Sequence, residues 1–328
     1  MVKLLSQKIV LLAGLTASAL AAAGERPLAV YNQGALARAF ELPALGETSV
    51  LASGASITDL RYDLTTEYHA SGDASESVVL DGEADLLTFA FRRGIGSNLE
   101  LTFDVPLLYQ GGGFMDSVVE DWHSAFGLPN GGREDAPHNR YLYQYQRNGA
   151  ILLDEQRSGT GIGDLRMGLG WQALAGLALR SEAKFGTGSE SHLSGGNSGI
   201  AVYGDYALPF PAGSMFSGFL SAGGSYNGKT GVLGDMQNQW IPFGSAGIAV
   251  RVLNSLSLLA QLYGSGALYS GSDLDPFREA LQFSMGLRYH IGQQLDFDLG
   301  FQEDPITSSS PDFSIHMGLS WRGGGDRG

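Results

Sequence analysis

The pattern of apolar and polar positions is most regular from Ile162 to Trp321. Segments of roughly ten residues there alternate apolar with small or polar side chains. In the clearest segment one face carries Leu281, Phe283, Met285, Leu287, Tyr289 and Ile291, and the other carries Gln282, Ser284, Gly286, Arg288 and His290. A period of two over that length predicts a β-strand, because a helix would repeat about every 3.6 residues.

Similar alternation elsewhere brings the total to about twelve strands. We expect them near 52–69, 76–93, 98–109, 161–174, 177–187, 199–210, 215–227, 239–253, 256–269, 281–291, 294–303 and 312–321. Connections after even-numbered strands are short, and those after odd-numbered strands are mostly longer. A soluble sandwich has no physical reason to keep that parity, whereas outer-membrane barrels have short periplasmic turns and long outer loops. The pattern predicts an all-β protein, a transmembrane antiparallel β-barrel of about 12 strands with periplasmic termini.

Aromatic residues near the predicted strand ends would form the two interfacial girdles of such a barrel. They are Tyr109, Tyr226, Trp240 and Tyr269 at the outer ends, and Phe91, Trp171, Phe210 and Trp321 at the periplasmic ends. The last strand resembles the aromatic-ended signal that the outer-membrane assembly machinery reads. We therefore expect that machinery and outer-membrane lipid as partners.

The two ends of the chain indicate its destination and its domains. Lys3 and Lys8 flank the start of a short apolar stretch, and three alanines end at Ala23, so residues 1–23 are expected to be a signal peptide. Residues 24–48 lack a clear period and would form a periplasmic extension, a plug in the lumen or a disordered leader. The barrel is expected over 49–321, with a tail over 322–328, in the outer membrane of a Gram-negative bacterium.

The composition restricts the possible partners of the protein more than it restricts the possible folds. The 328 residues carry a formal net charge of −14 and no cysteine. An acidic chain argues against nucleic acid as a partner, and the lack of cysteine excludes disulfides and thiolate metal sites. No cofactor is expected, because the Gly161-x-Gly163 sequence opens a strand, not the helix of a dinucleotide site.

The region 111–160 is the largest predicted outer loop. Apolar residues recur at helical spacing between Gly113 and Gly127, and Gly127 is a natural helix stop. Two short apolar runs around Asn148-Gly149 predict a hairpin with a tight turn. Parity places this helix and hairpin on the outer side, as a lid over the mouth or an inward-folded loop. The lid residues would be Phe114, Asp116, Glu120, Trp122, His123 and Arg133.

Strand alternation also predicts which charged side chains line the lumen. They are Asp59, Arg61, Asp63, Glu100, Asp104, Asp164, Arg166, Arg180, Glu182, Lys184, Asp205, Arg251, Arg288, His290, Asp296, Asp298 and His316. Rings of such charges could steer a polar solute through a channel. They could equally form a cross-strand ion-pair network that fills a narrow lumen.

Two other kinds of site have weaker support. Asp116, Glu120 and His123 share one side of the predicted helix and could bind a divalent cation, but they could also be the polar face of an amphipathic helix. The best candidate for a catalytic nucleophile, histidine and acid is His123-Ser124 beside Glu120. No Gly-x-Ser-x-Gly elbow is present. We assign no catalytic residue and do not expect an enzyme.

Several short blocks together resemble one known family. They are Leu-Asp-Gly-Glu at 80–83, Gly-Gly-Phe-Met-Asp-Ser at 112–117, Val-Glu-Asp-Trp-His at 119–123, Phe-Gly-Leu-Pro at 126–129, Gly132-Arg133, Asn32-Gln33, Gly-Ile-Gly-Asp at 161–164, and Lys184 with Thr187-Gly188. The chain resembles a proteobacterial outer-membrane family catalogued as domain of unknown function 3187. One departure is Gly186, where the family pattern has proline. The resemblance implies a barrel of unassigned function.

Three functional hypotheses follow from these patterns. The first is a passive channel or binding site for a small solute, with residues 112–133 controlling access. The second is a non-conducting structural or adhesion barrel, favoured if the lumen is plugged. The third is an outer-membrane hydrolase.

Overall fold

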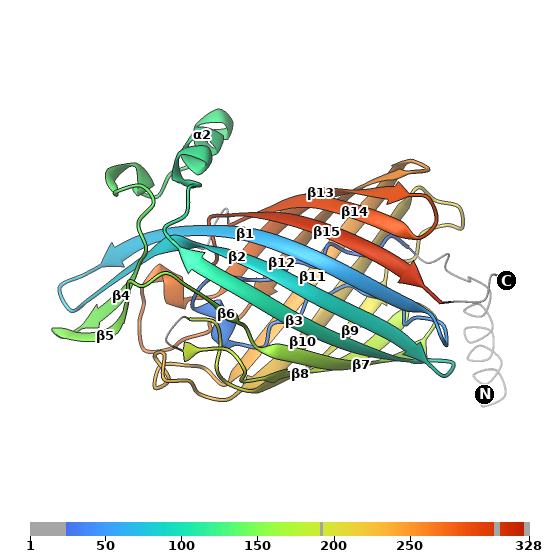
Figure 1. Ribbon diagram of the computed structural model, residues 1–328, viewed down its shortest axis with the longest axis horizontal. Helices are drawn as coiled ribbons and strands as arrows, with labels where there is room; N and C mark the ends of the chain where they lie inside the picture. The colour runs from blue at the N-terminus through green and yellow to red at the C-terminus, as the bar shows by residue number, and fades with distance from the viewer. Residues whose placement is uncertain (1–23, 191–192, 305–308, 325–328) are drawn as a thin grey trace, which may run out of the picture.

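The protein is a closed antiparallel β-barrel, here in a computed structural model that describes residues 24–190, 193–304 and 309–324 (Figure 1). The signal peptide predicted over 1–23 lies outside the described residues. The barrel strands are β1 (Ser56–Gly72), β2 (Glu76–Ile95), β3 (Leu99–Gly111), β7 (Leu165–Leu174), β8 (Leu177–Phe185), β9 (Gly199–Ala207), β10 (Phe216–Asn227), β11 (Trp240–Leu253), β12 (Leu256–Ser265), β13 (Ala280–Ile291), β14 (Leu295–Glu303) and β15 (Phe313–Gly323). Neighbours in this order pair with each other, and β15 pairs with β1, which closes the sheet.

The predicted strands and their connections are confirmed. Each predicted range overlaps one barrel strand, and four of the five turns on the side of the described chain ends have two or three residues, whereas the connection from β9 to β10 has eight. One predicted strand is broken: β6 (Gly159–Ile162) and β7 are separated by Gly163 and Asp164. The break occurs because the Asp164 carboxylate turns to accept the backbone N–H groups of Gly188 and Gly196, at 2.8 and 3.0 Å.

Side chains alternate between a polar interior and an apolar outer band, as the bilayer requires. On β1, Asp59, Arg61 and Asp63 are buried inside, while Leu60 is exposed outside. Of the predicted girdle residues, Tyr109, Tyr226, Trp240, Trp171, Phe210 and Trp321 are exposed large side chains. The prediction for Tyr269 is wrong. Because β12 ends at Ser265, Tyr269 lies in a loop that folds inward, and its hydroxyl donates to the Leu36 carbonyl at 2.9 Å.

None of the helices in the described residues is both long and apolar enough to cross a membrane.

Residues 24–51, which we call the inner segment, occupy the barrel interior. The Glu25 N–H donates to Ser217 near the periplasmic end of β10, at 3.1 Å. The segment runs outward to the short helix η1 (Ala37–Ala39), then returns, and the Leu51 N–H donates to Glu100 near the periplasmic end of β3, at 2.9 Å. It therefore passes through the interior twice before β1 begins.

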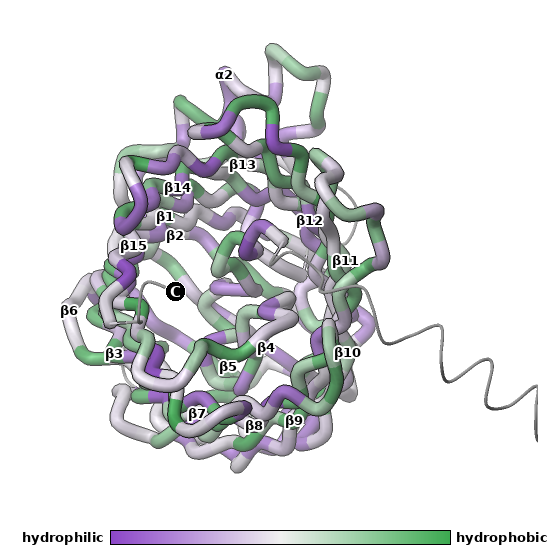
Figure 2. Tube along the Cα trace, turned by 90° about the vertical axis from the view of Figure 1, so that its right-hand side faces the viewer, coloured by the Kyte–Doolittle hydropathy of each residue, from purple (hydrophilic) through white to green (hydrophobic). Residues whose placement is uncertain are grey.

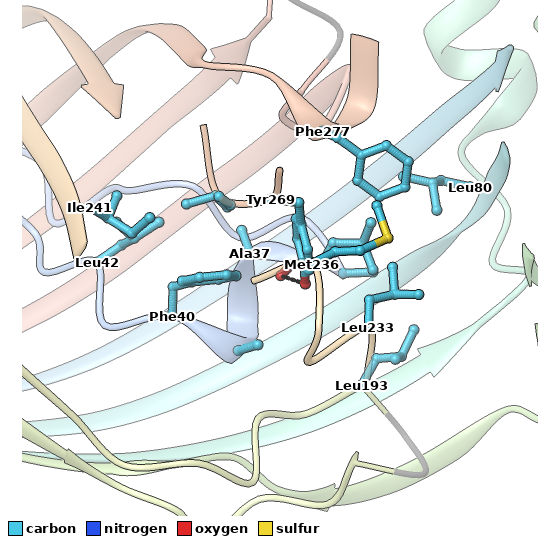
Figure 3. Close-up of a cluster of buried hydrophobic side chains, with 14 of the residues drawn as sticks. Ala37, Phe40, Leu42, Leu80, Leu193, Leu233, Met236, Ile241, Tyr269 and Phe277 are labelled. Atoms are coloured by element: carbon cyan, nitrogen blue, oxygen red, sulfur yellow. Dashed lines mark hydrogen bonds between the residues drawn. The ribbon is translucent and has the colours of Figure 1, made fainter. Parts of the chain in front are cut away.

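The outer half of the interior holds a hydrophobic core of the kind found in soluble proteins. Ala37, Phe40 and Leu42 of the inner segment pack there against Tyr269, Phe277 and other side chains of the outer loops (Figure 3). Tyr143 of β4 (Leu142–Arg147) belongs to the same core, and β4 extends the sheet beside β2. The β4 to β5 (Ala150–Glu155) hairpin turns at Asn148-Gly149, where both φ angles are positive. These loops close the outer mouth over the inner segment.

This core generates a stability prediction. Phe40→Ala should lower the free energy of opening of the inner segment by about 3–5 kcal/mol, because Phe40 is fully enclosed and the substitution leaves a cavity. Amide hydrogen exchange of residues 35–45 measures this opening. Phe114→Ala is the matched control, since Phe114 is largely exposed, and it should leave that exchange unchanged. Equal effects of the two variants would contradict the assigned core.

Candidate functional site in the barrel interior

The residues predicted to line the lumen lie on the inner wall, with one at its edge. Arg251 is half exposed at the periplasmic rim. Buried or half-buried inside the barrel are Asp59, Arg61, Asp63, Glu100, Asp104, Asp164, Arg166, Arg180, Glu182, Lys184, Asp205, Arg288, His290, Asp296, Asp298 and His316. Several pair within the wall, including Arg61 with Asp104, and His316 with Asp63 at 2.6 Å. Many of the others bind the inner segment.

At the periplasmic end, wall charges hold the start of the inner segment. The Glu25 carboxylate lies 3.2 Å from Arg251, 3.3 Å from His290 and 3.8 Å from Arg288. The Arg288 guanidinium is fully buried, lies 2.6 Å from Asp298, and donates to the backbone carbonyls of Arg26 and Pro27 at 2.7 and 3.1 Å. Arg288 therefore holds the inner segment both through the Glu25 side chain and through the backbone of Arg26 and Pro27.

Also in the periplasmic half, two arginines bracket the returning arm. Arg92 lies 2.5 Å from Glu47 of the inner segment and 3.0 Å from Glu100 of the wall. Arg180 lies 2.8 Å from Glu100 and donates to the carbonyls of Glu47 and Ser49. Burial of a guanidinium is costly unless its N–H donors are paired. Here each of the two guanidinium groups donates both to the wall and to the inner segment.

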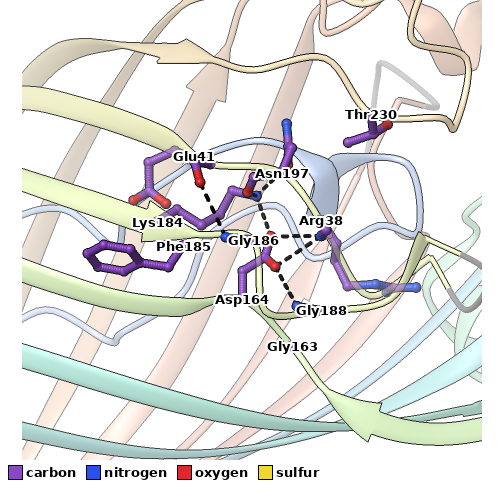
Figure 4. A network of polar contacts seen from close by, with 12 residues as sticks. Arg38, Glu41, Gly163, Asp164, Lys184, Phe185, Gly186, Gly188, Asn197 and Thr230 are labelled. Atoms are coloured by element: carbon purple, nitrogen blue, oxygen red, sulfur yellow. Dashed lines mark hydrogen bonds and ion pairs between the residues drawn. The ribbon is translucent and has the colours of Figure 1, made fainter.

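Further outward, the contacts continue up to the turn of the inner segment. Arg166 lies 3.1 Å from Glu41 and donates to the Tyr31 hydroxyl at 3.0 Å. Beside it, the Lys184 ammonium binds Asp164 and the Asn197 carbonyl, which ties β8 to the loop that follows it (Figure 4). The polar wall thus holds the segment along its whole length.

Sequence reasoning missed part of this site. Arg92 was missed because the inner face of β2 is otherwise small or apolar, as at Leu86 and Ala90, so no polar alternation marked it. The inner-segment charges were missed because residues 24–48 have no period. The presence of large apolar residues such as Leu28, Phe40 and Leu45 among those charges was the available signal that this segment is packed.

Open space remains at the periplasmic end of the interior. A cavity of about 630 Å³ there is lined by Glu25, Glu47, Arg92, Arg251 and Asp296, among others. A smaller cavity of about 90 Å³ lies deeper, between the inner segment and Arg61, Arg180 and Tyr203. Both are bounded on one side by the inner segment, so its position sets their extent.

The helix predicted as a lid is present, but it does not cover the mouth. α2 (Asp116–Phe126) packs with Met115 and Val119 against Leu64 and Phe313, whose side chains point out of the barrel. Trp122 lies on Phe301 and Phe313, with ring centroids 5.3 and 5.5 Å apart. Phe114 is exposed, and Arg133, in the short helix η2 (Arg133–Asp135), binds Asp116 and the outward-facing Thr66. The lid expectation failed because loop parity fixes the side of the membrane but not which face of the wall a loop covers.

The candidate metal ligands on this helix do not converge. Asp116 pairs with Arg133, Glu120 lies 2.9 Å from His138, and His123 contacts Asn130 at 3.2 Å. No group of three or more metal-binding side chains occurs in the part of the chain that the structure describes. The same contacts separate Glu120 from His123, so they do not form a catalytic pair.

Comparisons with known proteins agree with this fold. The sequence matches the family described as "Protein of unknown function (DUF3187)" over residues 1–322. No curated protein matches it. Among solved structures, it is similar to the COG4313 outer membrane channel from Pseudomonas putida F1, at 13% identity and a TM-score of 0.55, over 85% of this chain and 98% of that one.

Two other solved structures are more distant. A deletion mutant of the TodX monoaromatic hydrocarbon channel has 13% identity and a TM-score of 0.44, over 89% of this chain and 98% of that one. The NanC porin has 10% identity and a TM-score of 0.41, over 80% and 98%. The match at 0.55 supports the closed β-barrel fold.

The contacts of the inner segment generate a paired prediction. Arg288→Met should speed amide exchange of residues 25–30, because it removes a buried cation that holds Glu25 and two backbone carbonyls. Arg251→Met removes a cation from the same Glu25, but this guanidinium is half exposed, and surface ion pairs contribute little. Mass spectrometry should therefore show faster exchange of residues 25–30 in Arg288→Met than in Arg251→Met, and indistinguishable rates would contradict the role of Arg288 in positioning the start of the inner segment.

A second prediction concerns pH. The interaction with the Glu303 carboxylate, 3.8 Å away, raises the pKa of His123 above its ordinary value, against the opposing effect of burial. A raised pKa means that protonation of His123 stabilises the docked helix. This stabilisation is complete at pH values below the ordinary pKa of histidine. It is lost as the pH rises through the raised pKa of His123.

Amide exchange of residues 116–126, corrected for intrinsic rates, should therefore show more opening at mildly alkaline than at mildly acidic pH. Glu303→Gln should remove most of this pH dependence, and an unchanged pH profile in that variant would count against the pair.

Proposed function

The chain belongs to the DUF3187 family, whose function is unknown, and for this member we propose a passive outer-membrane channel for a small polar solute, governed by the inner segment. The observation that carries the proposal is the occupation of the interior by residues of the same chain. A twelve-strand barrel is wide enough to enclose more than its own wall side chains. Movement of the inner segment is the step that would open such a path.

The contacts that hold the inner segment support a reversible position. In the periplasmic half they are ion pairs and hydrogen bonds, such as Glu47 with Arg92 and Glu25 with Arg288. A polar solute can compete for such partners, whereas it cannot compete for an apolar core. Arg92 and Glu47 both line the periplasmic cavity, so a solute that enters this cavity meets the first of these pairs.

The wall charges would set which solutes pass. Arg166, Arg180, Lys184, Arg251 and Arg288 would counter the lumen carboxylates once the inner segment has moved. Arg92 joins this set because it faces the same space. Residues 112–133 have no part in this gate, since α2 packs on the outside of the wall.

Single-channel conductance in planar bilayers tests the proposal. The chain lacking residues 24–51 but keeping its signal peptide should show steady openings, and the full chain should show rare or gated ones. A variant with residues 112–133 replaced by a short Gly-Ser link is the matched control, and it should conduct like the full chain. Circular dichroism and heat-modifiable gel migration confirm folding of each variant.

A second candidate is a non-conducting structural or adhesion barrel. The closed apolar core at the outer mouth, around Phe40, Tyr143 and Tyr269, specifically favours it. On this hypothesis the full chain stays silent at every voltage and with every polar solute tested, although the deletion variant conducts. Silence of the folded deletion variant would reject the channel proposal itself.

A further inference from the structure

One surface of the protein has no role in the barrel interior: the exposed edge of α2. Phe114, Val118 and Phe126 are 64, 47 and 64% exposed, although α2 already buries Met115 and Val119 against the wall. Val118 and Phe126 of α2, together with Phe114 directly before the helix, form an apolar patch of the kind that marks an interaction site. The position of α2 on the wall indicates what covers this patch.

α2 lies where the outer face of the wall changes from apolar to polar. The pairing of β1, β15 and β14 places outward-facing residues in rows: Tyr62, Met317 and Leu299, then Leu64, Ile315 and Phe301, then Thr66, Phe313 and Glu303. Met317 and Leu299 in the first row are exposed to lipid. The last row contains the first polar residues. α2 covers the second and third rows, so it lies at the edge of the apolar band.

The contacts of α2 also fix how it is turned about its own axis. Trp122 contacts Phe301 in the apolar row, while His123 faces Glu303 in the polar row, at 3.8 Å. The side of α2 that carries Trp122 is therefore nearer the membrane, and the side that carries Asp116 and His123 is turned away from it, against polar partners.

A helical wheel then divides the surface of α2 into three sectors. Successive residues are separated by about 100°. Met115, Val119 and His123 face the wall. Val118 and Ala125 lie on the membrane side of this sector, next to Trp122. The exposed polar residues Ser117 and Ser124 lie on the water side, and the exposed Asp121 lies between these two sectors. This three-way division is expected for a helix that touches protein, lipid and water at once.

Both views agree with a position beside the barrel. α2 projects sideways from the end opposite the C-terminus in Figure 1, and it lies outside the ring of strands in Figure 2. We propose that α2 is an interfacial helix, and that its residues Val118 and Phe126, with the preceding Phe114, insert among the acyl chains of the outer leaflet. The occupant is lipid because the patch continues the lipid-facing band of β14 and β15.

Site-directed spin labelling tests this inference without removing any contact of the fold. The chain has no cysteine, so single substitutions label cleanly. The test position is Val118→Cys. Ser124→Cys, on the polar side of the same helix, is the matched control, and Leu299→Cys on the lipid-facing wall is the positive control. Each full-length protein is reconstituted into phosphatidylcholine vesicles containing phosphatidylglycerol, and collision rates are measured with oxygen and with a water-soluble nickel chelate.

The expected result is an oxygen-to-nickel ratio at position 118 close to that at 299 and several-fold above that at 124. A ratio at 118 equal to that at 124 would overturn the proposal, because both sides of α2 would then face water. Shielding of position 118 from both reagents would also overturn it, in favour of a second copy of the chain. None of these outcomes depends on whether the barrel conducts.

Discussion

The structure depends on one constraint: in hydrocarbon, every backbone N–H and carbonyl must find a partner within the protein. A chain that crosses with strands meets this constraint only by closing the sheet, here by pairing β1 with β15. Closure of twelve strands encloses a wide interior. That interior must be filled by water, by side chains or by other parts of the chain, and most of the remaining structure consists of what fills it.

The inner segment fills this space in two different ways. In the outer half, Phe40 and its neighbours form an apolar core with the inward-folded loops, and this core excludes water. In the periplasmic half, the segment is held by charges such as Glu25, Glu47, Arg92 and Arg288. Buried ion pairs lose hydration that their attraction only partly returns, so they are weak sources of stability but strong determinants of position. The outer half therefore anchors the segment, and the periplasmic half aligns it.

Strand positions and the inner face of the wall could be predicted because both follow from local alternation. Residues such as Asp63, Arg180 and His316 lie inside as their parity predicts. Arg92 could not be found this way, because its neighbours on the inner face of β2 are apolar. The positions of α2 and the inner segment depend on packing between residues far apart in sequence. Glu25 meets Arg288, and Val119 meets Phe313, and neither contact leaves a local pattern.

The path of the inner segment also bears on the order in which the barrel is assembled. The segment enters and leaves the interior at the same end, and its last contacts lie directly before β1. β1 is also one side of the seam with β15, the final strand of the chain. Residues 24–51 therefore reside in the space that the last strand seals. An open sheet can receive the inner segment from the side, whereas a closed barrel admits it only from the periplasmic end. The time at which β1 pairs with β15 therefore decides whether the barrel closes around the inner segment.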